Sequence, residues 1–239
     1  MDGIRGVFFD LHGTLLISDD ISKAWDEWRE AFHGCMVDCG LETSMEEFQV
    51  EVEGIFEKAE PEYDSPGLSV FERRVMELCG RHGLEMDREY MGWMVDHIIG
   101  IWYRGMYMDP EAQTVLEALR PRYRTALITN WDHTPWIRRW LADSNITGWF
   151  EDIVISDEAG CTKPDPRIFR IALERLGLEP GEMAYVGDAP EDVRGALAVG
   201  SIPILIRRNQ SGDQSDHGDI GGDVRVISRL SELLVLFQP

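Results

Sequence analysis

Short apolar runs alternate with helical patterns over much of the chain. Runs of apolar and β-branched residues, bounded by polar or glycine positions, predict buried strands at Ile4–Phe9, Thr125–Ile128, Ile153–Ile155, Met183–Val186, Ile202–Ile206 and Val224–Ile227. Between them, helical periodicity predicts helices at Pro110–Leu119, Trp136–Ala142, Pro166–Leu176 and Pro190–Val199. This alternation predicts an α/β protein with a doubly wound, Rossmann-like parallel sheet covered on both faces.

The alternation stops after the first predicted strand. From residue 18 to residue 106, apolar positions recur only at helical spacing, as in the stripe that contains Trp28 and Phe32. We therefore expect a discontinuous core, residues 1–17 and 107–239, with an all-helical cap inserted at 18–106. Hinge strands near Leu16 and Met108 would let the cap open and close over the core.

Composition and charge narrow the possible partners. Hydrophobic residues make up 44% of the 239 residues, which is enough for a sizeable core. The formal net charge of −21 should repel polyanions, so we expect no nucleic-acid partner. We find no secretory pattern and no apolar run long enough to span a bilayer, and we expect a cytoplasmic monomer or homodimer. The polar, glycine-rich stretch from Asn209 to Asp223 is typical of a surface loop.

Polar residues stand where several predicted strands end. Asp10 follows the first strand, Thr129 and Asn130 follow the second, and Asp188 follows the strand Met183–Val186. Reactive groups gather outside the carboxyl ends of the strands in such sheets. Lys163 is also notable, because the chain has only two other lysines, Lys23 and Lys58. These residues are therefore the candidates for a functional site.

Together these residues form four motifs in chain order. They are Asp10–Thr14 (DLHGT), Leu127–Asn130 (LITN), Lys163–Pro166 (KPDP) and Val186–Asp192 (VGDAPED). This order resembles the haloacid dehalogenase-like hydrolase superfamily, with a helical cap between the first and second motifs. The resemblance covers nearly the whole chain. It is close to the branch that carries S/T-N-W/F-D after the second strand and K-P-D-P-x-I-F after the third, which match Thr129–Asp132 and Lys163–Phe169.

The resemblance implies a Mg²⁺-dependent phosphatase that acts on a small phosphorylated metabolite. Asp10 would be the nucleophile and would form an aspartyl-phosphate intermediate. Mg²⁺ would be held by the carboxylates of Asp10 and Asp188 and by the backbone carbonyl of His12, with Asp192 in a supporting role. A hard cation of this kind neutralises charge on the phosphoryl group during its transfer.

The same resemblance assigns the phosphate-binding residues. Thr129 would hydrogen-bond a phosphoryl oxygen, and the backbone of Asn130 would help to complete the cradle. Lys163 would contact both the phosphoryl group and Asp10, and would keep Asp10 ionised. Trp131 either stacks on the substrate or packs beneath the cap.

His12 departs from the pattern of the superfamily's phosphatases, which carry a second aspartate there as the acid/base group. An imidazole, with an ordinary pKa of about 6.5, can also exchange protons near neutral pH. Either His12 takes over that role, or it is a spectator or a specificity residue. Other members with a different residue here cleave phosphonates or carbon–halogen bonds. A third reading is a degenerate member that binds a phosphorylated ligand or a partner without turnover.

Overall fold

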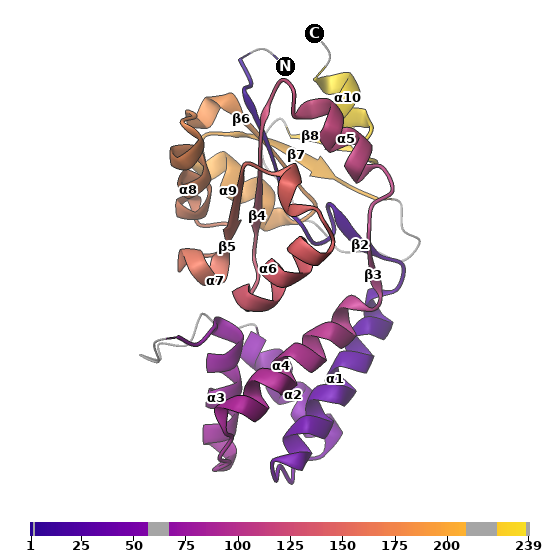
Figure 1. Cartoon of the computed structure of the whole chain (residues 1–239), viewed down its shortest axis with the longest axis vertical. Coiled ribbons are helices and arrows are strands. Elements are labelled where there is room, and N and C mark those ends of the chain that lie inside the picture. The colour runs from indigo at the N-terminus through magenta and orange to yellow at the C-terminus, as the bar shows by residue number, and fades with distance from the viewer. Residues whose placement is uncertain (2, 57–66, 209–223, 238–239) are drawn as a thin grey trace. The chain divides into compact units, whose positions relative to one another are not determined.

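The computed structural model describes residues 1, 3–56, 67–208 and 224–237 (Figure 1). The surface loop predicted between Asn209 and Asp223 lies outside these residues. The chain divides into two compact units. The sheet unit contains Met1–Ile17, Met108–Trp131 and Arg138–Pro239, and the helical unit contains Ser18–Tyr107 and Asp132–Ile137.

A six-stranded parallel sheet forms the centre of the sheet unit (Figure 1). The strand order is β5-β4-β1-β6-β7-β8. The bounds are β1 Gly6–Phe9, β4 Arg124–Thr129, β5 Asp152–Ile155, β6 Met183–Gly187, β7 Ile202–Ile206 and β8 Arg225–Ile227. The order runs in opposite directions on the two sides of β1, and the carboxyl ends of strands at such a switch point form a crevice. The predicted fold class is confirmed.

Helices flank this sheet, and α8 and α9 pack against each other and against the sheet (Figure 1). Each has a proline at its first position, where a missing N–H costs nothing, and both helices were predicted with the bounds found here. The other elements are α5 Ala112–Leu119, α6 Thr134–Asp143, α7 Ser156–Ala159, α10 Glu232–Leu236 and the short 3₁₀ helices Thr147–Trp149 and Pro180–Glu182.

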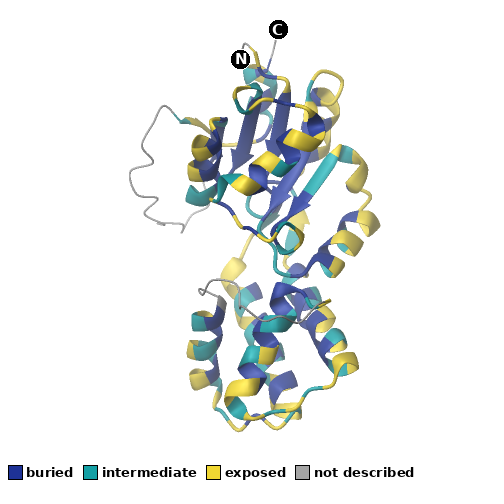
Figure 2. Ribbon diagram, turned by 90° about the vertical axis from the view of Figure 1, so that its left-hand side faces the viewer, coloured by how far each residue is buried: buried dark blue, intermediate teal, exposed yellow. Residues whose placement is uncertain are grey.

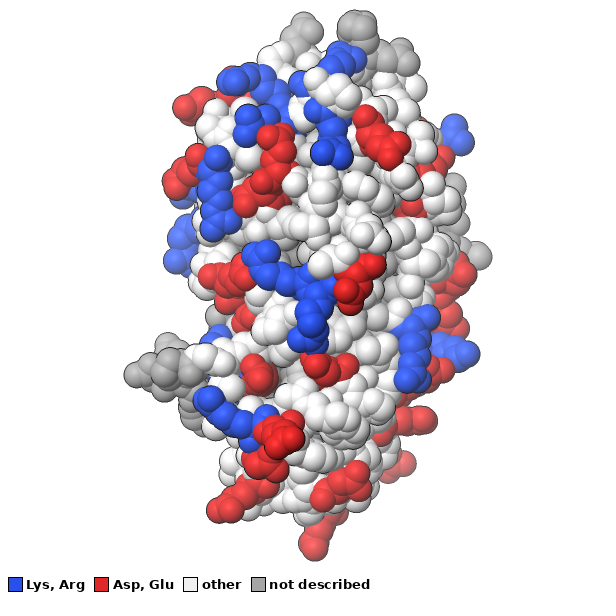
Figure 3. All heavy atoms as spheres, viewed as in Figure 1, with Lys and Arg blue, Asp and Glu red and all other residues white. Residues whose placement is uncertain are grey.

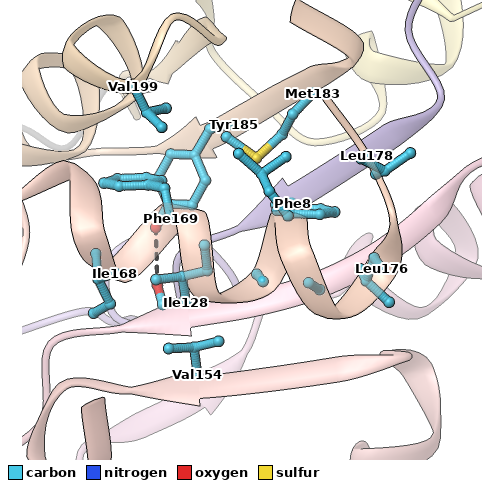
Figure 4. Packing of buried hydrophobic residues seen from close by; sticks show 14 of the residues in the cluster. Phe8, Ile128, Val154, Ile168, Phe169, Leu176, Leu178, Met183, Tyr185 and Val199 are labelled. Carbon is cyan, nitrogen blue, oxygen red and sulfur yellow. Dashed lines mark hydrogen bonds between the residues drawn. The ribbon is translucent and has the colours of Figure 1, made fainter. Parts of the chain in front are cut away.

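The core of the sheet unit lies between the strands and helices α8 and α9. Figure 2 shows the strands buried along most of their length and the helices exposed on their outer sides. Phe169 of α8 meets Tyr185 of β6 edge to face, with ring centroids 4.9 Å apart (Figure 4). The Tyr185 hydroxyl donates a hydrogen bond to the Ile128 carbonyl oxygen at 2.8 Å, which satisfies a polar group in an apolar cluster.

In its described residues, the helical unit contains α1 Ile21–Asp38, α2 Met45–Phe56, α3 Val70–His82 and α4 Arg88–Tyr103, together with the first turn of α6. Aromatic side chains fill its core, and the ring of Phe32 lies within about 5–6 Å of the rings of Trp28 and Phe48. Strands β2 (Leu16–Ser18) and β3 (Met106–Met108) pair where the chain leaves and re-enters the sheet unit. The hinge motion expected at these strands stays a prediction.

The surface bears on the expected partners. On the face shown in Figure 3, acidic and basic side chains are interspersed. That the protein binds no nucleic acid stays a prediction from its formal net charge of −21. Throughout the described part of the chain, we find no helix that combines the length and the apolar character needed to cross a bilayer.

The close packing of α9 gives a direct test of the fold. A Cβ atom added at Gly195 would lie 2.4 Å from Cε2 of Phe169, so we expect Gly195→Ala to lower the free energy of unfolding by about 1–3 kcal/mol. Gly34 is also helical but has nothing within 4 Å of such an atom. Gly34→Ala should therefore raise that energy by about 0.5–1 kcal/mol. Urea unfolding measures both changes, and two changes of the same sign would contradict the packing.

Candidate active site

The predicted site residues meet at the carboxyl edge of the sheet. Asp10 directly follows β1, Thr129 is the last residue of β4, and Asp188 directly follows β6. Lys163 comes from the loop before α8, and Asp192 lies in the first turn of α9. Neighbouring parallel strands thus bring together groups that lie far apart in the sequence.

Lys163 is the centre of this cluster. Its Nζ atom donates hydrogen bonds to Oδ1 of Asp10 at 2.5 Å, to Oδ1 of Asp192 at 2.7 Å and to the Tyr185 hydroxyl at 3.2 Å. Burial by itself would lower the pKa of Lys163, but the neighbouring carboxylates outweigh it and hold this pKa well above its usual value. The side chain, only 4% exposed, therefore carries its positive charge.

Three carboxylates face this single ammonium group. One oxygen each from Asp10, Asp188 and Asp192 lies within 4.8 Å of the other two. Burial raises the pKa of Asp10 to about 8, and the charges of Asp192 and Asp188 act in the same direction. The charge of Lys163 lowers this pKa but does not offset these effects, so Lys163 alone does not keep Asp10 ionised as predicted. Burial and then the charge of Asp192 raise the pKa of Asp188 to about 6. The cluster therefore has more negative charge than Lys163 balances, and a proton or a cation relieves the excess.

The turn after Asp10 lies directly against Asp188. Gly13 has a positive φ of 79°, and a Cβ atom at this position would lie 2.0 Å from Oδ2 of Asp188. Glycine is thus required both for the backbone conformation and for the space. Thr14 donates a hydrogen bond from Oγ1 to Oδ1 of Asp188 at 3.3 Å. The turn and the Asp188 carboxylate therefore form one packed unit.

His12 and Trp131 stack on each other, with ring centroids 4.8 Å apart and planes inclined by 18°. Burial lowers the pKa of His12 to about 3, and the positive charge of Lys163 contributes in the same direction. The imidazole is consequently neutral at physiological pH. The backbone N–H of Trp131 donates to Oγ of Ser156 at 2.9 Å, which holds the residue at the end of β4.

Thr129 and Asn130 differ in what they contact. Among the described residues, Oγ1 of Thr129 is buried and has no hydrogen-bond partner. A buried hydroxyl without a partner costs about 1–3 kcal/mol, so this atom fits a site that a ligand oxygen completes. The Asn130 side chain instead exchanges two hydrogen bonds with the backbone of Lys163, at 2.8 and 3.1 Å, and so positions that lysine. The predicted phosphate contact from the Asn130 backbone stays a prediction.

Tyr185 and Ser156 also belong to this site and were not predicted from the sequence. Tyr185 supplies an oxygen to Lys163, and Ser156 Oγ bonds both the N–H and, at 3.2 Å, the carbonyl oxygen of Trp131. A tyrosine inside an apolar run was the one available signal, because its buried hydroxyl needs a partner. Ser156 had no comparable signal.

Comparisons with known proteins agree with this architecture. The model of the haloacid dehalogenase-like hydrolase family matches residues 4–200. The chain is 30% identical to glyceraldehyde 3-phosphate phosphatase from Methanopyrus kandleri over 236 residues, covering 97% of this chain and 96% of that one. It is 23% identical to (S)-2-haloacid dehalogenase 1 from a Pseudomonas species, covering 98% of each chain.

A solved structure shows the same fold. The crystal structure of a HAD phosphatase from Thermococcus onnurineus superposes with a TM-score of 0.67 at 23% identity, covering 98% of this chain and 97% of that one. The fold and the family match together define a hydrolase. The chain belongs to the haloacid dehalogenase-like hydrolase family, as its motifs predicted.

The raised pKa of Asp10 predicts that the metal-free protein loses stability as the pH rises. An ordinary aspartate releases its proton near pH 3.8, whereas folded Asp10 keeps it to about pH 8. Between these values the folded state binds more protons, so its stability falls with rising pH. From about pH 5.5 to about pH 8 in EDTA, this fall should be smaller in Asp10→Asn by about 1 kcal/mol or more, at about 1.4 kcal/mol per pKa unit. Equal falls in urea unfolding would contradict the raised pKa.

Proposed function

We propose that the protein is a Mg²⁺-dependent phosphatase that hydrolyses a small phosphorylated metabolite through an aspartyl-phosphate on Asp10. The observation that carries this proposal is the contact of Lys163 with Asp10, 2.5 Å, within a buried cluster of carboxylates at the carboxyl edge of the sheet. The family match and the phosphatase from Methanopyrus kandleri among its relatives support the same activity.

The residues present fit a divalent cation. Carboxylate oxygens within 4.8 Å of one another are the donors that Mg²⁺ prefers, and the excess negative charge of the cluster favours a cation. Asp10, Asp188 and the backbone carbonyl of His12 would hold it. When bound, it would neutralise charge that develops on the transferring phosphoryl group. Asp192 accepts hydrogen bonds from Lys163 and from the Ala189 N–H, so its support is indirect.

The protein's own groups divide the chemistry into two steps. In the first, a carboxylate oxygen of Asp10 attacks the phosphorus atom, the bond between phosphorus and the ester oxygen breaks, and the leaving alkoxide takes a proton from solvent water, which produces the alcohol and the aspartyl-phosphate. The Thr129 hydroxyl and the Lys163 ammonium donate hydrogen bonds to the phosphoryl oxygens. In the second, water attacks the phosphorus atom, releases phosphate and regenerates Asp10.

We propose that His12 acts in the second step. A neutral imidazole can accept a proton from the attacking water, and the low pKa of His12 leaves it neutral at physiological pH. The same low pKa makes it a weaker base than the imidazole with an ordinary pKa that the sequence predicted. The stack on Trp131 fixes the plane of the ring. The alternative is that this stack is the whole role of His12, which would then shape the pocket without moving protons.

The substrate and its setting are part of this proposal. A helical unit that closes as a cap over the site would admit a small metabolite and exclude a polymer. Trp131 lies beside the reacting groups and would contact that metabolite. We infer a cytoplasmic enzyme that works as a monomer or homodimer. The dehalogenase relative keeps carbon–halogen cleavage as a second candidate, and phosphonate cleavage is a third. The contacts among Asp10, Lys163 and Asp192 argue against a degenerate binder.

A panel of phosphate esters tests the activity. The parent should release phosphate with Mg²⁺ and lose this activity in EDTA, and Asp10→Asn should lower kcat by about 10³-fold or more because an amide cannot form the acyl-phosphate. Asp143→Asn, at an exposed position of the same unit, is the matched control and should keep the parent rate. Release of halide without metal, or no phosphate from any ester, would overturn the proposal.

Substitutions of His12 test its role. His12→Asn keeps a polar side chain but removes the base, and we expect it to lower kcat by about 10²-fold. His12→Asp restores a base, and the burial that lowers the pKa of the imidazole would raise that of a carboxyl group, so this variant should keep activity with its pH optimum shifted toward higher pH. The pH profile of kcat measures both effects. Equal activity of the two variants at every pH would show that His12 moves no proton.

A further inference from the structure

Arg208 makes a set of contacts that the proposed chemistry does not use. It follows β7, and its side chain, 16% exposed, reaches the turn after Asp10. Nη2 donates to the Thr14 carbonyl oxygen at 2.5 Å, and Nε donates to the Gly13 carbonyl oxygen at 3.4 Å. Nη1 pairs with the buried carboxylate of Asp109. One guanidinium group therefore binds three oxygen atoms from two separate segments.

We propose that Arg208 is a positioning residue that holds the Gly13–Thr14 turn against Asp188 and ties it to Asp109, where the chain re-enters the sheet unit. This inference builds on the proposed function, because Asp188 is a proposed metal ligand. The turn is where the position of Asp188 is set, since Gly13 leaves no room for a Cβ atom beside that carboxylate and Thr14 hydrogen-bonds it.

The topology explains why an arginine is needed at this place. Strand β6 lies between β1 and β7, so Arg208 must span the end of β6 to reach the turn after β1. The carbonyl oxygens of Gly13 and Thr14 lie in a turn outside the sheet and accept hydrogen bonds from Arg208, which supplies the donors that such groups need. A planar guanidinium offers five N–H donors in a fixed fork, whereas a lysine offers a single point charge.

The contact with Asp109 extends this arrangement to a linker. The Asp109 N–H donates to the Leu15 carbonyl oxygen at 2.8 Å, so the segment after β3 is bonded to the turn through its backbone as well as through Arg208. Arg208 thus joins the end of β7, the turn and the second linker of the helical unit. We therefore expect a displacement of the end of β7, of the turn or of the linker to change the position of the Asp188 carboxylate.

A matched pair of variants separates positioning from loss of charge. Arg208→Met removes the contacts, while Arg207→Met removes the same charge from the adjacent, exposed arginine. We would measure the Kd for Mg²⁺ alone by calorimetry. Groups that orient metal ligands typically contribute 10–100-fold to affinity, so Arg208→Met should raise this Kd by about 10-fold or more. Arg207→Met should stay within about 2-fold of the parent, and Arg208→Lys should recover part of the loss.

Hydrogen exchange gives a second readout that needs neither metal nor activity. Amides of residues 11–16 and 109–112 should exchange faster in Arg208→Met than in Arg207→Met, while those of α8 stay the same. Equal Kd values and equal exchange in the two variants would overturn the proposal, as would a uniform rise in exchange with no change in Kd. If the parent releases no phosphate, the proposed function fails, and these two measurements still decide the role of Arg208. If the parent binds no Mg²⁺, exchange alone decides it.

Discussion

The Lys163 ammonium group is buried, and the site depends on the side chains that balance its positive charge. Removing an unpaired ammonium from water costs several kcal/mol, so such a group persists only where it is paired and hydrogen-bonded. Asp10, Asp192 and Tyr185 supply those partners from β1, α9 and β6. The register that pairs β1 with β6 places Asp10 beside the end of the strand that carries Tyr185. The charge of one side chain is thus balanced only when three elements come together.

The same cluster contains more negative than positive charge, because Asp188 adds a third carboxylate to the two that contact Lys163. A core chosen for stability alone would not hold such an excess of like charge, and functional sites are where this departure is expected. The raised pKa values of Asp10 and Asp188 express the cost of that excess. A divalent cation would offset this excess of negative charge, and a phosphoryl oxygen would give the Thr129 hydroxyl the hydrogen-bond partner that it lacks among the described residues. Binding and stability are therefore linked through one set of atoms.

Much of this arrangement was predictable from the sequence. Apolar runs located the strands to within one or two residues, and the rule that reactive groups gather at carboxyl ends singled out Asp10, Thr129 and Asp188. The rarity of lysine pointed to Lys163. Tyr185 and Arg208 were not predicted, because a tyrosine within a strand is typical of a core residue and an arginine after a strand is typical of a surface residue.

The sequence does not show which residues far apart along the chain lie close together in space. Arg208 lies 195 residues from Gly13, and no spacing pattern connects two such positions. The same reason explains why residues 132–137 group with the helical unit although they follow the second motif directly. The roles assigned to the site residues rest on the resemblance, and the two domain boundaries rest on where the alternation of strands and helices stops. Both stay proposals.

The chain passes from the sheet unit to the helical unit between Trp131 and Asp132. Trp131 stacks on His12 and is held by Ser156, whereas the carbonyl oxygen of Asp132 accepts from the Phe71 N–H at 2.8 Å and its carboxylate pairs with Arg74 at 3.0 Å. Consecutive residues are therefore anchored in different units. The residue on the sheet-unit side of this boundary is the one that stacks on His12, where the chain departs from the phosphatase pattern. A substitution of the second aspartate by histidine is best understood together with Trp131, because the two rings stack on each other and neither ring can be replaced without changing the surroundings of the other.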